Sequence, residues 1–271
     1  MATYYPVFDL NRLFTVGFPI DRTSDMILIF SDFGVTGPYS GAMRAVVHRE
    51  APDVTVCDLM VDAPDRNPKA SAYLLAALSR EFHPGDVVLC VVDPGVGSQR
   101  RGLVVECDGV LFVGPDNGLF EILIRRAGKC RVKVINWYPA NASASFHGRD
   151  IFAPVACMIA KGEPVALADI DPAQRYVPAQ SWPDELSEII YVDTYGNLMT
   201  GLVAAPGWQN RSLSLLINGQ LLSPARTFSD VELGHGFHYR NSIGLCEIAV
   251  NCGRADQVFG AEIGTAVFIR D

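Results

Sequence analysis

Residues 86–93 read DVVLCVVD, an apolar run that ends in a carboxylate. Because both alternating sets of side chains are apolar, the run predicts a strand that is buried on both faces and central in a sheet. Asp93 and the turn residues after it (94–97, PGVG) then fall where this strand ends. Helices are expected to cover both sides of the sheet.

Strand-like and helix-like segments alternate on either side of this run. Residues 26–31 predict a short strand, and residues 38–50 and 68–82 predict helices from their apolar spacing. The dipeptide Asp108-Gly109 predicts a two-residue hairpin, which adds an antiparallel pair. The expected fold is therefore α/β, with a mixed, mostly parallel sheet and helices on both faces. Further helices are expected at 118–128 and 149–162.

The pattern changes after a proline-containing segment, residues 171–185, which we interpret as a linker. Residues 186–271 show short strands separated by turn signals and no helix-length period, which predicts a smaller, all-β, barrel-like domain. The predicted organisation is an extension (1–25), an α/β catalytic domain (26–170), the linker and the β domain.

Composition excludes several classes of protein. Lys plus Arg number 22 against 30 for Asp plus Glu, and there is no basic tract, so nucleic acid is not an expected partner. No apolar run reaches the ~20 residues that span a bilayer, so no membrane association is expected. The start of the chain lacks the pattern of a secretory signal, and we expect a cytoplasmic protein. The seven cysteines are scattered and form no C-x-x-C pair, which argues against disulfides and structural zinc and favours small buried thiols.

Carboxylates recur where the predicted strands end. Asp32, Asp93 and Asp116 each lie in a glycine-containing loop, and His147 precedes a predicted helix. One such loop is ordinary turn chemistry. In an open α/β sheet, however, ligands bind at the carboxyl ends of the strands, so the recurrence predicts a polar active site there.

Six blocks carry a family resemblance. In chain order they are SDFG (31–34), VVDPGVGSQR (91–100), VGPDNG (113–118), FHGRDIFAP (146–154), VDTYGN (192–197) and NSIGLCEIAVN (241–251). Together they closely resemble the S-adenosyl-L-methionine (SAM) hydroxide adenosyltransferases, the adenosine-forming SAM hydrolases related to fluorinase and chlorinase. The resemblance extends over residues 26–268.

The resemblance implies a catalytic trio of Asp93, Arg100 and His147, with Arg101 as a neighbour that could be mistaken for Arg100. The implied reaction is attack of water on the ribose 5′ carbon of SAM, which releases adenosine and L-methionine. Such a reaction needs an activated nucleophile, because water is a poor one and the sulfur leaves as a neutral thioether. A positioned base supplies ~10²- to 10⁴-fold in rate. No cofactor or metal is implied.

The resemblance also assigns the substrate-binding residues. Asp32 is expected to bind the ribose hydroxyls, and Asp193 and Ser242 the amino-acid end of SAM. Asn197 is expected to read the adenine, and Val250 to contact it through the backbone. Family members form homotrimers in which the ligand lies between the large domain of one subunit and the small domain of the next, so one chain alone would hold half a site.

Two departures separate this chain from the halogenases. The halogenases carry a halide-contacting serine where this sequence has Gly148, and an arginine where this sequence has Ile243. They also lack the Asp and Arg of the trio. Water is therefore the expected nucleophile.

Two other functions stay open at this stage. Asp32, Asp93, Asp116 and His147 have the residue types of a Mg²⁺ or Mn²⁺ site, which would suit a phosphoester hydrolase. A non-catalytic adenosine or SAM binding module would use the same pocket without turnover.

Overall fold

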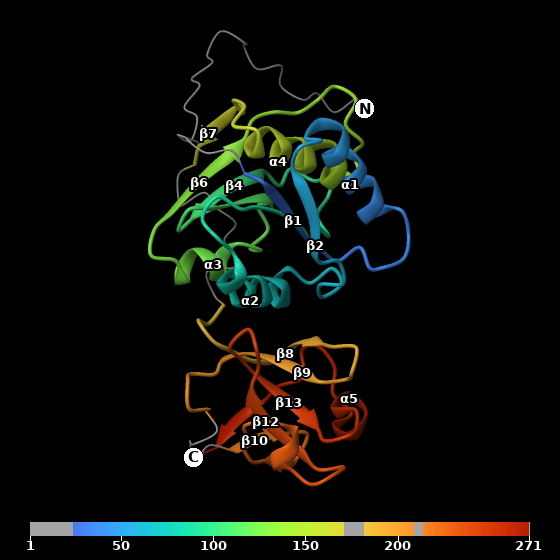
Figure 1. The fold of residues 1–271 in the computed structure, drawn as a ribbon, viewed down its shortest axis with the longest axis vertical. Helices are drawn as coiled ribbons and strands as arrows, with labels where there is room; N and C mark the ends of the chain where they lie inside the picture. Colours follow the sequence, from blue (N-terminus) through green and yellow to red (C-terminus); the bar gives the residue numbers. More distant parts are fainter. Residues whose placement is uncertain (1–23, 171–181, 209–213, 271) are drawn as a thin grey trace.

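The structure is a computed structural model that describes residues 24–170, 182–208 and 214–270. Of the predicted extension and linker, residues 1–23 and 171–181 lie outside the described residues. Figure 1 shows an α/β body, which contains residues 24–170, above a smaller β-rich body.

The α/β body is built on a seven-stranded sheet of order β2-β1-β3-β5-β4-β6-β7. Pairs β2-β1, β1-β3 and β3-β5 are parallel, whereas β5-β4, β4-β6 and β6-β7 are antiparallel. The predicted mixed sheet is confirmed, and β3 is buried along its whole length as expected. The strands are β1 (Met26–Ser31), β2 (Thr55–Met60), β3 (Val87–Val91), β4 (Gly102–Cys107), β5 (Val110–Pro115), β6 (Cys130–Ile135) and β7 (Leu167–Asp169).

Helices cover both faces of the sheet because alternate strand side chains are apolar on each side. Ile27 and Ile29 pack in one core cluster with α1 (Tyr39–Glu50) and α4 (Ala153–Ala160). Leu28 and Phe30 pack in the other, beside α2 (Pro68–Leu78) and α3 (Glu121–Arg126). Among the described residues, no helix is both long and apolar enough to cross a bilayer.

The β-rich body contains two small antiparallel sheets, of order β12-β13-β9-β8 and β11-β10-β14. In the residues that the structure describes, the expected all-β character holds apart from a short α-helix, α5 (Ala255–Phe259), and a 3₁₀ turn at Phe228–Asp230. Strands β9 and β12 had no clear signal in the sequence. The strands are β8 (Leu186–Val192), β9 (Leu198–Val203), β10 (Ser214–Ile217), β11 (Gln220–Leu222), β12 (Gly236–Arg240), β13 (Leu245–Val250) and β14 (Phe268–Arg270).

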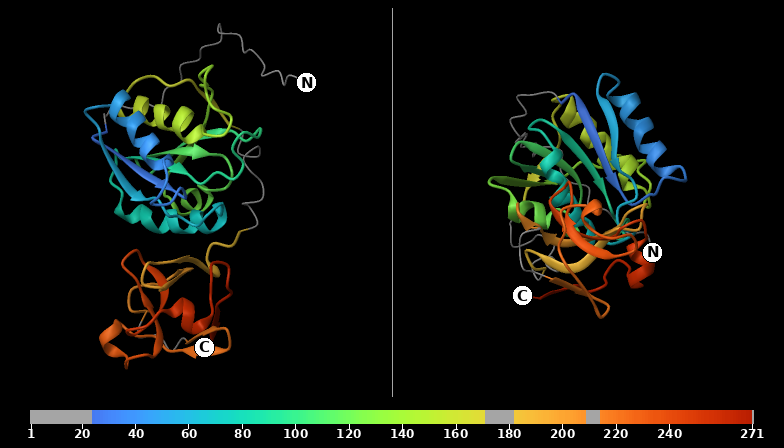
Figure 2. Two further views of the ribbon diagram at one scale, coloured as in Figure 1. Left: turned by 90° about the vertical axis from the view of Figure 1, so that its right-hand side faces the viewer. Right: turned by 60° about the horizontal axis from the view of Figure 1, so that its bottom comes forward.

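The two bodies meet where α2 lies against β8, as Figures 1 and 2 show. Leu186 and Ile190 of β8 belong to the same buried cluster as the apolar face of α2. The ammonium of Lys69 lies 3.0 Å from the carboxylate of Glu188, and the Tyr191 hydroxyl donates to Asp62 at 2.8 Å. Apolar and polar contacts therefore both join the bodies within one chain.

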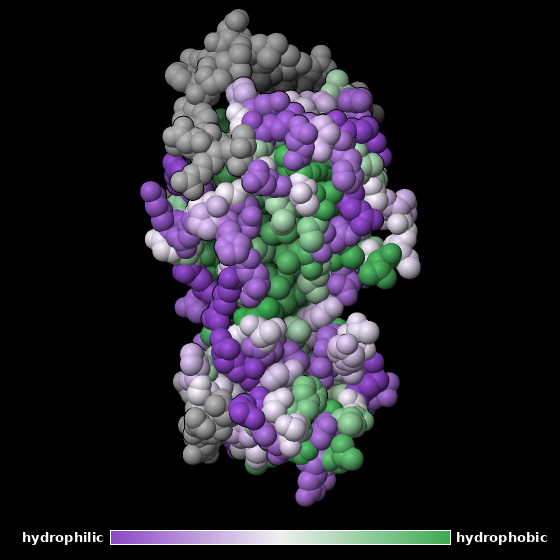
Figure 3. All heavy atoms as spheres, viewed as in Figure 1, coloured by the Kyte–Doolittle hydropathy of each residue, from purple (hydrophilic) through white to green (hydrophobic). Residues whose placement is uncertain are grey.

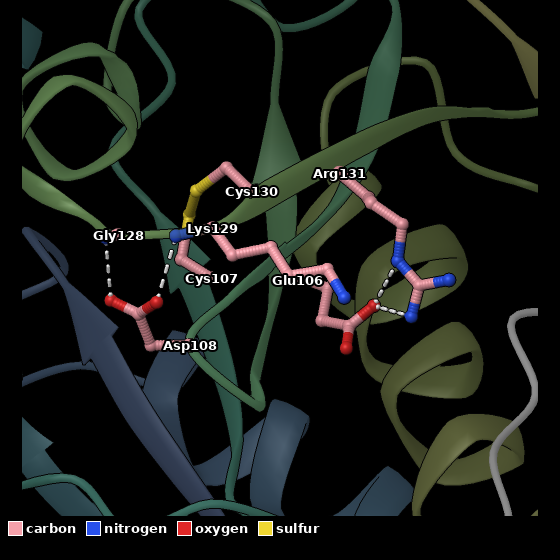
Figure 4. The surroundings of a disulfide bond; sticks show 7 residues. All are labelled: Glu106, Cys107, Asp108, Gly128, Lys129, Cys130 and Arg131. Atoms are coloured by element: carbon pink, nitrogen blue, oxygen red, sulfur yellow. Dashed lines mark hydrogen bonds and ion pairs between the residues drawn. A yellow bond between two sulfur atoms is a disulfide. The ribbon is translucent and has the colours of Figure 1, made fainter.

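One expectation about the cysteines is wrong. Cys107 and Cys130 form a disulfide, because β4 and β6 pair in a register that sets these two residues directly opposite each other (Figure 4). The sequence showed neither this pairing nor its register. Cys90, Cys157 and Cys246 are free and buried as expected, whereas Cys57 and Cys252 are free and exposed.

Candidate active site

The loops that follow β1, β3 and β5 lie side by side, because these strands are parallel neighbours in the sheet. Asp32 follows β1, Asp93 follows β3 and Asn117 follows β5. The Asn117 amide donates to the Val92 carbonyl at 2.8 Å and so ties the last two loops together. The expected polar cluster at the carboxyl ends of the strands is present.

Asp93 and Arg100 form a buried ion pair within this cluster. The Arg100 Nε lies 2.9 and 3.0 Å from the two Asp93 carboxylate oxygens, and its Nη2 donates to Oδ2 as well. The two side chains, Arg100 and Asp93, are only 8% and 5% exposed. Phe152 packs under the guanidinium, whose Cζ lies 5.1 Å from the ring centroid. The bidentate contact and this stacking fix both side chains in one orientation.

His147 completes the group. Its Nδ1 lies 2.9 Å from Arg100 Nη2. Arginine only donates, so Nδ1 accepts, and the proton of the neutral ring is on Nε2. Burial and the Arg100 cation lower the pKa of His147 below its usual 6.5. The ring is therefore neutral at pH 7 and offers an N–H donor at Nε2.

A turn of π-helix, Gly148–Phe152, follows His147 and precedes α4. Such single turns are frequent at functional sites. Gly148 allows a close approach here, since a Cβ at this position would lie 3.1 Å from Val91 of β3 and 3.2 Å from the Met43 sulfur. A side chain at this position would therefore require Val91 or Met43 to shift.

Asp116 and Arg101 form a second ion pair, with Arg101 Nη2 2.8 Å from Asp116 Oδ2. Arg100 is thus the arginine that contacts Asp93 and His147, whereas Arg101 pairs with Asp116. Within the described residues, no three His, Cys, Asp or Glu side chains lie together as a metal site requires. The geometry gives no support to the set of Asp32, Asp93, Asp116 and His147 as metal ligands.

Asp32 lies beside the trio with one carboxylate oxygen bound. Its Oδ2 accepts the Arg66 backbone N–H at 2.8 Å. Burial raises the pKa of Asp32, and the charge of nearby Asp93 adds to the increase. Its other oxygen is available to a ligand that donates hydrogen bonds, such as a pair of hydroxyls.

The remaining expected site residues gather around a cleft of about 840 Å³ in the β-rich body. Asp193, Asn197, Ser242 and Val250 all line it. Its lining residues come only from positions 193–254, so the trio lies outside it. One chain therefore presents two groups of site residues, one on each body.

Asp193 organises the turn after β8. Its Oδ1 accepts the N–H groups of Tyr195 and Asn197 at 2.9 and 2.8 Å, and its Oδ2 accepts the Asn197 side-chain amide at 2.9 Å. Because the Asn197 amide nitrogen is held by Asp193, the amide oxygen is the atom that can accept from a ligand.

Sequence reasoning missed several residues that line the cleft, namely Tyr195, Met199, Phe228, Tyr239, Asn241, Glu247, Cys252, Gly253 and Arg254. Glu247 had one available signal, a lone carboxylate within the apolar run LCEIAV (245–250). A charged residue in a buried strand is uncommon unless it is paired or functional. Phe228 and Tyr239 had none, because aromatic residues are ordinary in β-rich cores.

Comparison with known families matches both bodies of this chain. Residues 27–169 match the SAM hydroxide adenosyltransferase N-terminal domain, and residues 187–268 match the C-terminal domain of the same family. An (R)-S-adenosyl-L-methionine hydrolase of Thermus thermophilus is 34% identical over 89% of this chain and 98% of its own length. A protein of the same name from Salinispora tropica is 35% identical over 86% of this chain and 93% of its own.

Solved structures share the fold. A conserved protein of Thermotoga maritima superposes with a TM-score of 0.80 at 28% identity, over 91% of this chain and 100% of its own. A conserved protein of Thermus thermophilus superposes with a TM-score of 0.69 at 32% identity, over 92% of this chain and 100% of its own. Both bodies are thus similar to those of known proteins.

Proposed function

Because the chain belongs to the SAM hydroxide adenosyltransferase family, we propose that it hydrolyses S-adenosyl-L-methionine to adenosine and L-methionine. The observation that carries the proposal is the contact of Arg100 with both Asp93 and His147 at the carboxyl ends of the strands. It supports activation of water by a fixed group of one anion, one cation and one neutral imidazole.

In the proposed reaction, water attacks the ribose 5′ carbon and forms the new C–O bond as the C–S bond breaks. The bonding electrons stay on sulfur, which leaves as the neutral thioether of methionine. The attacking oxygen becomes strongly acidic as it bonds to carbon, so a carboxylate is a sufficient base. Asp93 takes the proton at Oδ1, which accepts only the Arg100 Nε–H and so keeps an acceptor site, whereas Oδ2 accepts from both Nε and Nη2.

Arg100 and His147 assist this step without being consumed. The guanidinium favours a nucleophile with hydroxide character, since an adjacent cation stabilises developing negative charge. The Nε2–H of His147 donates to the water oxygen and orients it, because its Nδ1 is held by Arg100. Holding the water in line with the C–S bond supplies the rest of the acceleration.

We propose the substrate-binding roles that the resemblance to the family implies. Asp32 binds the ribose hydroxyls with its remaining acceptor sites. In the cleft, the Asn197 amide oxygen accepts from the adenine amino group, and Val250 contacts the ring through its backbone. Asp193 and Ser242 hold the amino-acid end.

We further propose that the active enzyme is a cytoplasmic homotrimer whose sites lie between subunits. The separation of the trio from the cleft within one chain supports this proposal, because a partner could supply the missing half. Figure 3 also shows apolar side chains over β1 and β2, where the edge strand leaves Val56, Leu59 and Met60 partly exposed. Contiguous apolar surface of this kind favours association.

Incubation of the protein with SAM should release adenosine and methionine in equal amounts, measured by liquid chromatography and mass spectrometry. Addition of a chelator should leave the rate unchanged, whereas a metal-dependent phosphoesterase would lose activity. Release of homocysteine or methylthioadenosine would contradict the bond cleavage proposed. Tight binding of SAM without any turnover would identify a binding module instead.

The rate should fall at acid pH with a midpoint below 6.5. Protonation of His147 removes the Nδ1 acceptor and sets a second cation against Arg100, so the neutral ring is the active form. The same lowered pKa means that the unfolded chain binds this proton more readily, so stability falls as pH drops below about 6.5. The measurement is kcat/KM for SAM from pH 5 to 9.

His147→Asn serves as the control for this profile, because the asparagine side chain retains an acceptor near Nδ1 and does not titrate. Its residual activity should be independent of pH over the same range. A midpoint above 6.5 in the wild type, or an unchanged acid limb in the variant, would assign the titration to another group.

A further inference from the structure

The segment between β2 and α2 contains a residue in an unusual backbone conformation. The Asn67 N–H donates to the Pro64 carbonyl at 3.1 Å, which closes a four-residue turn whose third residue is Arg66. Arg66 has a φ of 50°, in the left-handed region. A positive φ at the third position is typical of a type II turn, where glycine or asparagine is the usual residue. An arginine there is strained, so the surrounding structure must hold it in place.

The side chain of Arg66 does not account for this conformation. Its Nη2 lies 3.0 Å from Oδ2 of Asp65, the preceding residue, and the two side chains are 76% and 69% exposed. Exposed ion pairs of this kind contribute little to stability. The reason for the strained conformation therefore lies in the backbone of Arg66.

The backbone N–H of Arg66 contacts one of the expected substrate-binding residues. It donates to Asp32 Oδ2 at 2.8 Å, although the two residues are 34 positions apart in the chain. Burial and the negative charges of Asp65 and Asp93 raise the pKa of Asp32, and the Arg66 N–H acts in the opposite direction. The hydrogen bond thus favours the ionised carboxylate and fixes one of its oxygens, which leaves Oδ1 to the ligand.

The chain is attached to the fold on either side of Arg66. The Ala63 N–H donates to the Ser31 carbonyl at 3.0 Å, which joins the segment to the end of β1. Asn67 caps α2, because its Oδ1 accepts the Ala70 N–H at 3.0 Å. Between these two attachments, the φ of Arg66 decides where its N–H points.

We propose that Arg66 is a positioning residue whose left-handed backbone holds the Asp32 carboxylate ready for the ribose hydroxyls of an adenosyl ligand. Its guanidinium is not needed for this task, because the hydrogen-bond donor is the backbone N–H. The inference rests on the proposed function, which assigns the ribose hydroxyls to Asp32.

Substitutions at position 66 separate the backbone from the side chain. Arg66→Gly and Arg66→Asn introduce residues that adopt a positive φ readily, so both variants should bind adenosine as tightly as the wild type. Arg66→Val should bind adenosine about 10- to 100-fold more weakly, because a β-branched residue disfavours the left-handed region and one hydrogen bond to a charged group is lost. Isothermal titration calorimetry measures these affinities.

The analogue 2′,3′-dideoxyadenosine, which lacks both ribose hydroxyls, distinguishes positioning from general damage to the site. Its affinity should be the same for Arg66→Val and the wild type, because it offers Asp32 no hydroxyl to bind. Arg66→Ala is a milder change than Arg66→Val, and its affinity for adenosine should lie between those of the glycine and valine variants. The alanine variant keeps the test decisive even if Arg66→Val folds poorly.

Asp108→Val is the matched control. Asp108 also has a positive φ, 51°, but it lies in the β4–β5 hairpin, at the opposite end of β5 from the site. Its carboxylate accepts the N–H groups of Gly128 and Lys129 at 3.0 and 2.9 Å, so the variant gains the same strain and also loses two hydrogen bonds. It should unfold more readily than the wild type and yet keep the wild-type affinity for adenosine.

Weaker binding of adenosine by Arg66→Gly would show that the guanidinium itself contacts the ligand and would overturn the proposal. An unchanged affinity of Arg66→Val for adenosine, or an equal loss for adenosine and its dideoxy analogue, would overturn it too. Because adenosine is not hydrolysed, the binding test is independent of turnover. A protein that shows the predicted series but releases no adenosine from SAM would refute the hydrolase and leave the positioning role standing.

Discussion

Asp93→Asn should lower the turnover of SAM by about 10²- to 10⁴-fold, the range for loss of a positioned base. The asparagine keeps the shape of the side chain, but it presents an amide nitrogen to Arg100 and no longer accepts a proton from water. Binding of adenosine should change little, because the groups proposed to hold the nucleoside are Asp32 and the cleft residues. Single-turnover kinetics with saturating enzyme separates the two effects.

Asp169→Asn is a matched control for this variant. Asp169 of β7 pairs with Lys133 at the surface of the same body, with the Asp169 side chain 82% exposed. Exposed ion pairs contribute little to stability, about 0 to 1 kcal/mol, so this variant should retain wild-type turnover. Turnover by Asp93→Asn above a tenth of the wild-type rate would show that another group accepts the proton.

Reduction of the Cys107–Cys130 disulfide should lower the free energy of unfolding by about 3 kcal/mol, the effect expected for closing a loop of this size. The two residues are 23 positions apart in the chain and join β4 to β6. Urea unfolding with and without a thiol reductant measures the difference. Intact-protein mass spectrometry after alkylation shows whether the bond has opened.

The double variant Cys107→Ala/Cys130→Ala should unfold at the same urea concentration with or without reductant. Cys57 and Cys252 are exposed and free, so their alkylation serves as an internal standard in both states. Alkylation of Cys107 and Cys130 in the untreated protein would show that the bond is absent in solution.

The parts of the fold that the sequence predicted were those with local signals. The run 86–93 is apolar on both faces and became the buried strand β3. Asp108-Gly109 became a hairpin turn because both residues adopt positive φ, 51° and 87°. The pairing of β4 with β6 depends on contacts distant in sequence, and so the disulfide could not be predicted.

Some features of the candidate site could also be predicted from the sequence, and others required the structure. Asp93, Arg100 and His147 could be selected because they lie in blocks that resemble a known family, and the geometry brings their side chains into contact. Glu247 belongs to one of those blocks, but its position on the cleft floor depends on the pairing of β12 with β13. The tautomer of His147 likewise required the distance from Nδ1 to Arg100.

Because of the π turn after His147, the position of the His147 side chain depends on the number of residues in that turn. The N–H of Ala153 bonds to the Gly148 carbonyl, five residues back, where an α-helix would bond four back. Relative to a continuous helix, the segment therefore contains one added residue, and each helical residue turns the chain by about 100°. If a single residue were deleted there and α4 kept its place in the core, the His147 imidazole would move away from the Arg100 guanidinium. The number of residues between 147 and 153 therefore matters as much as their types.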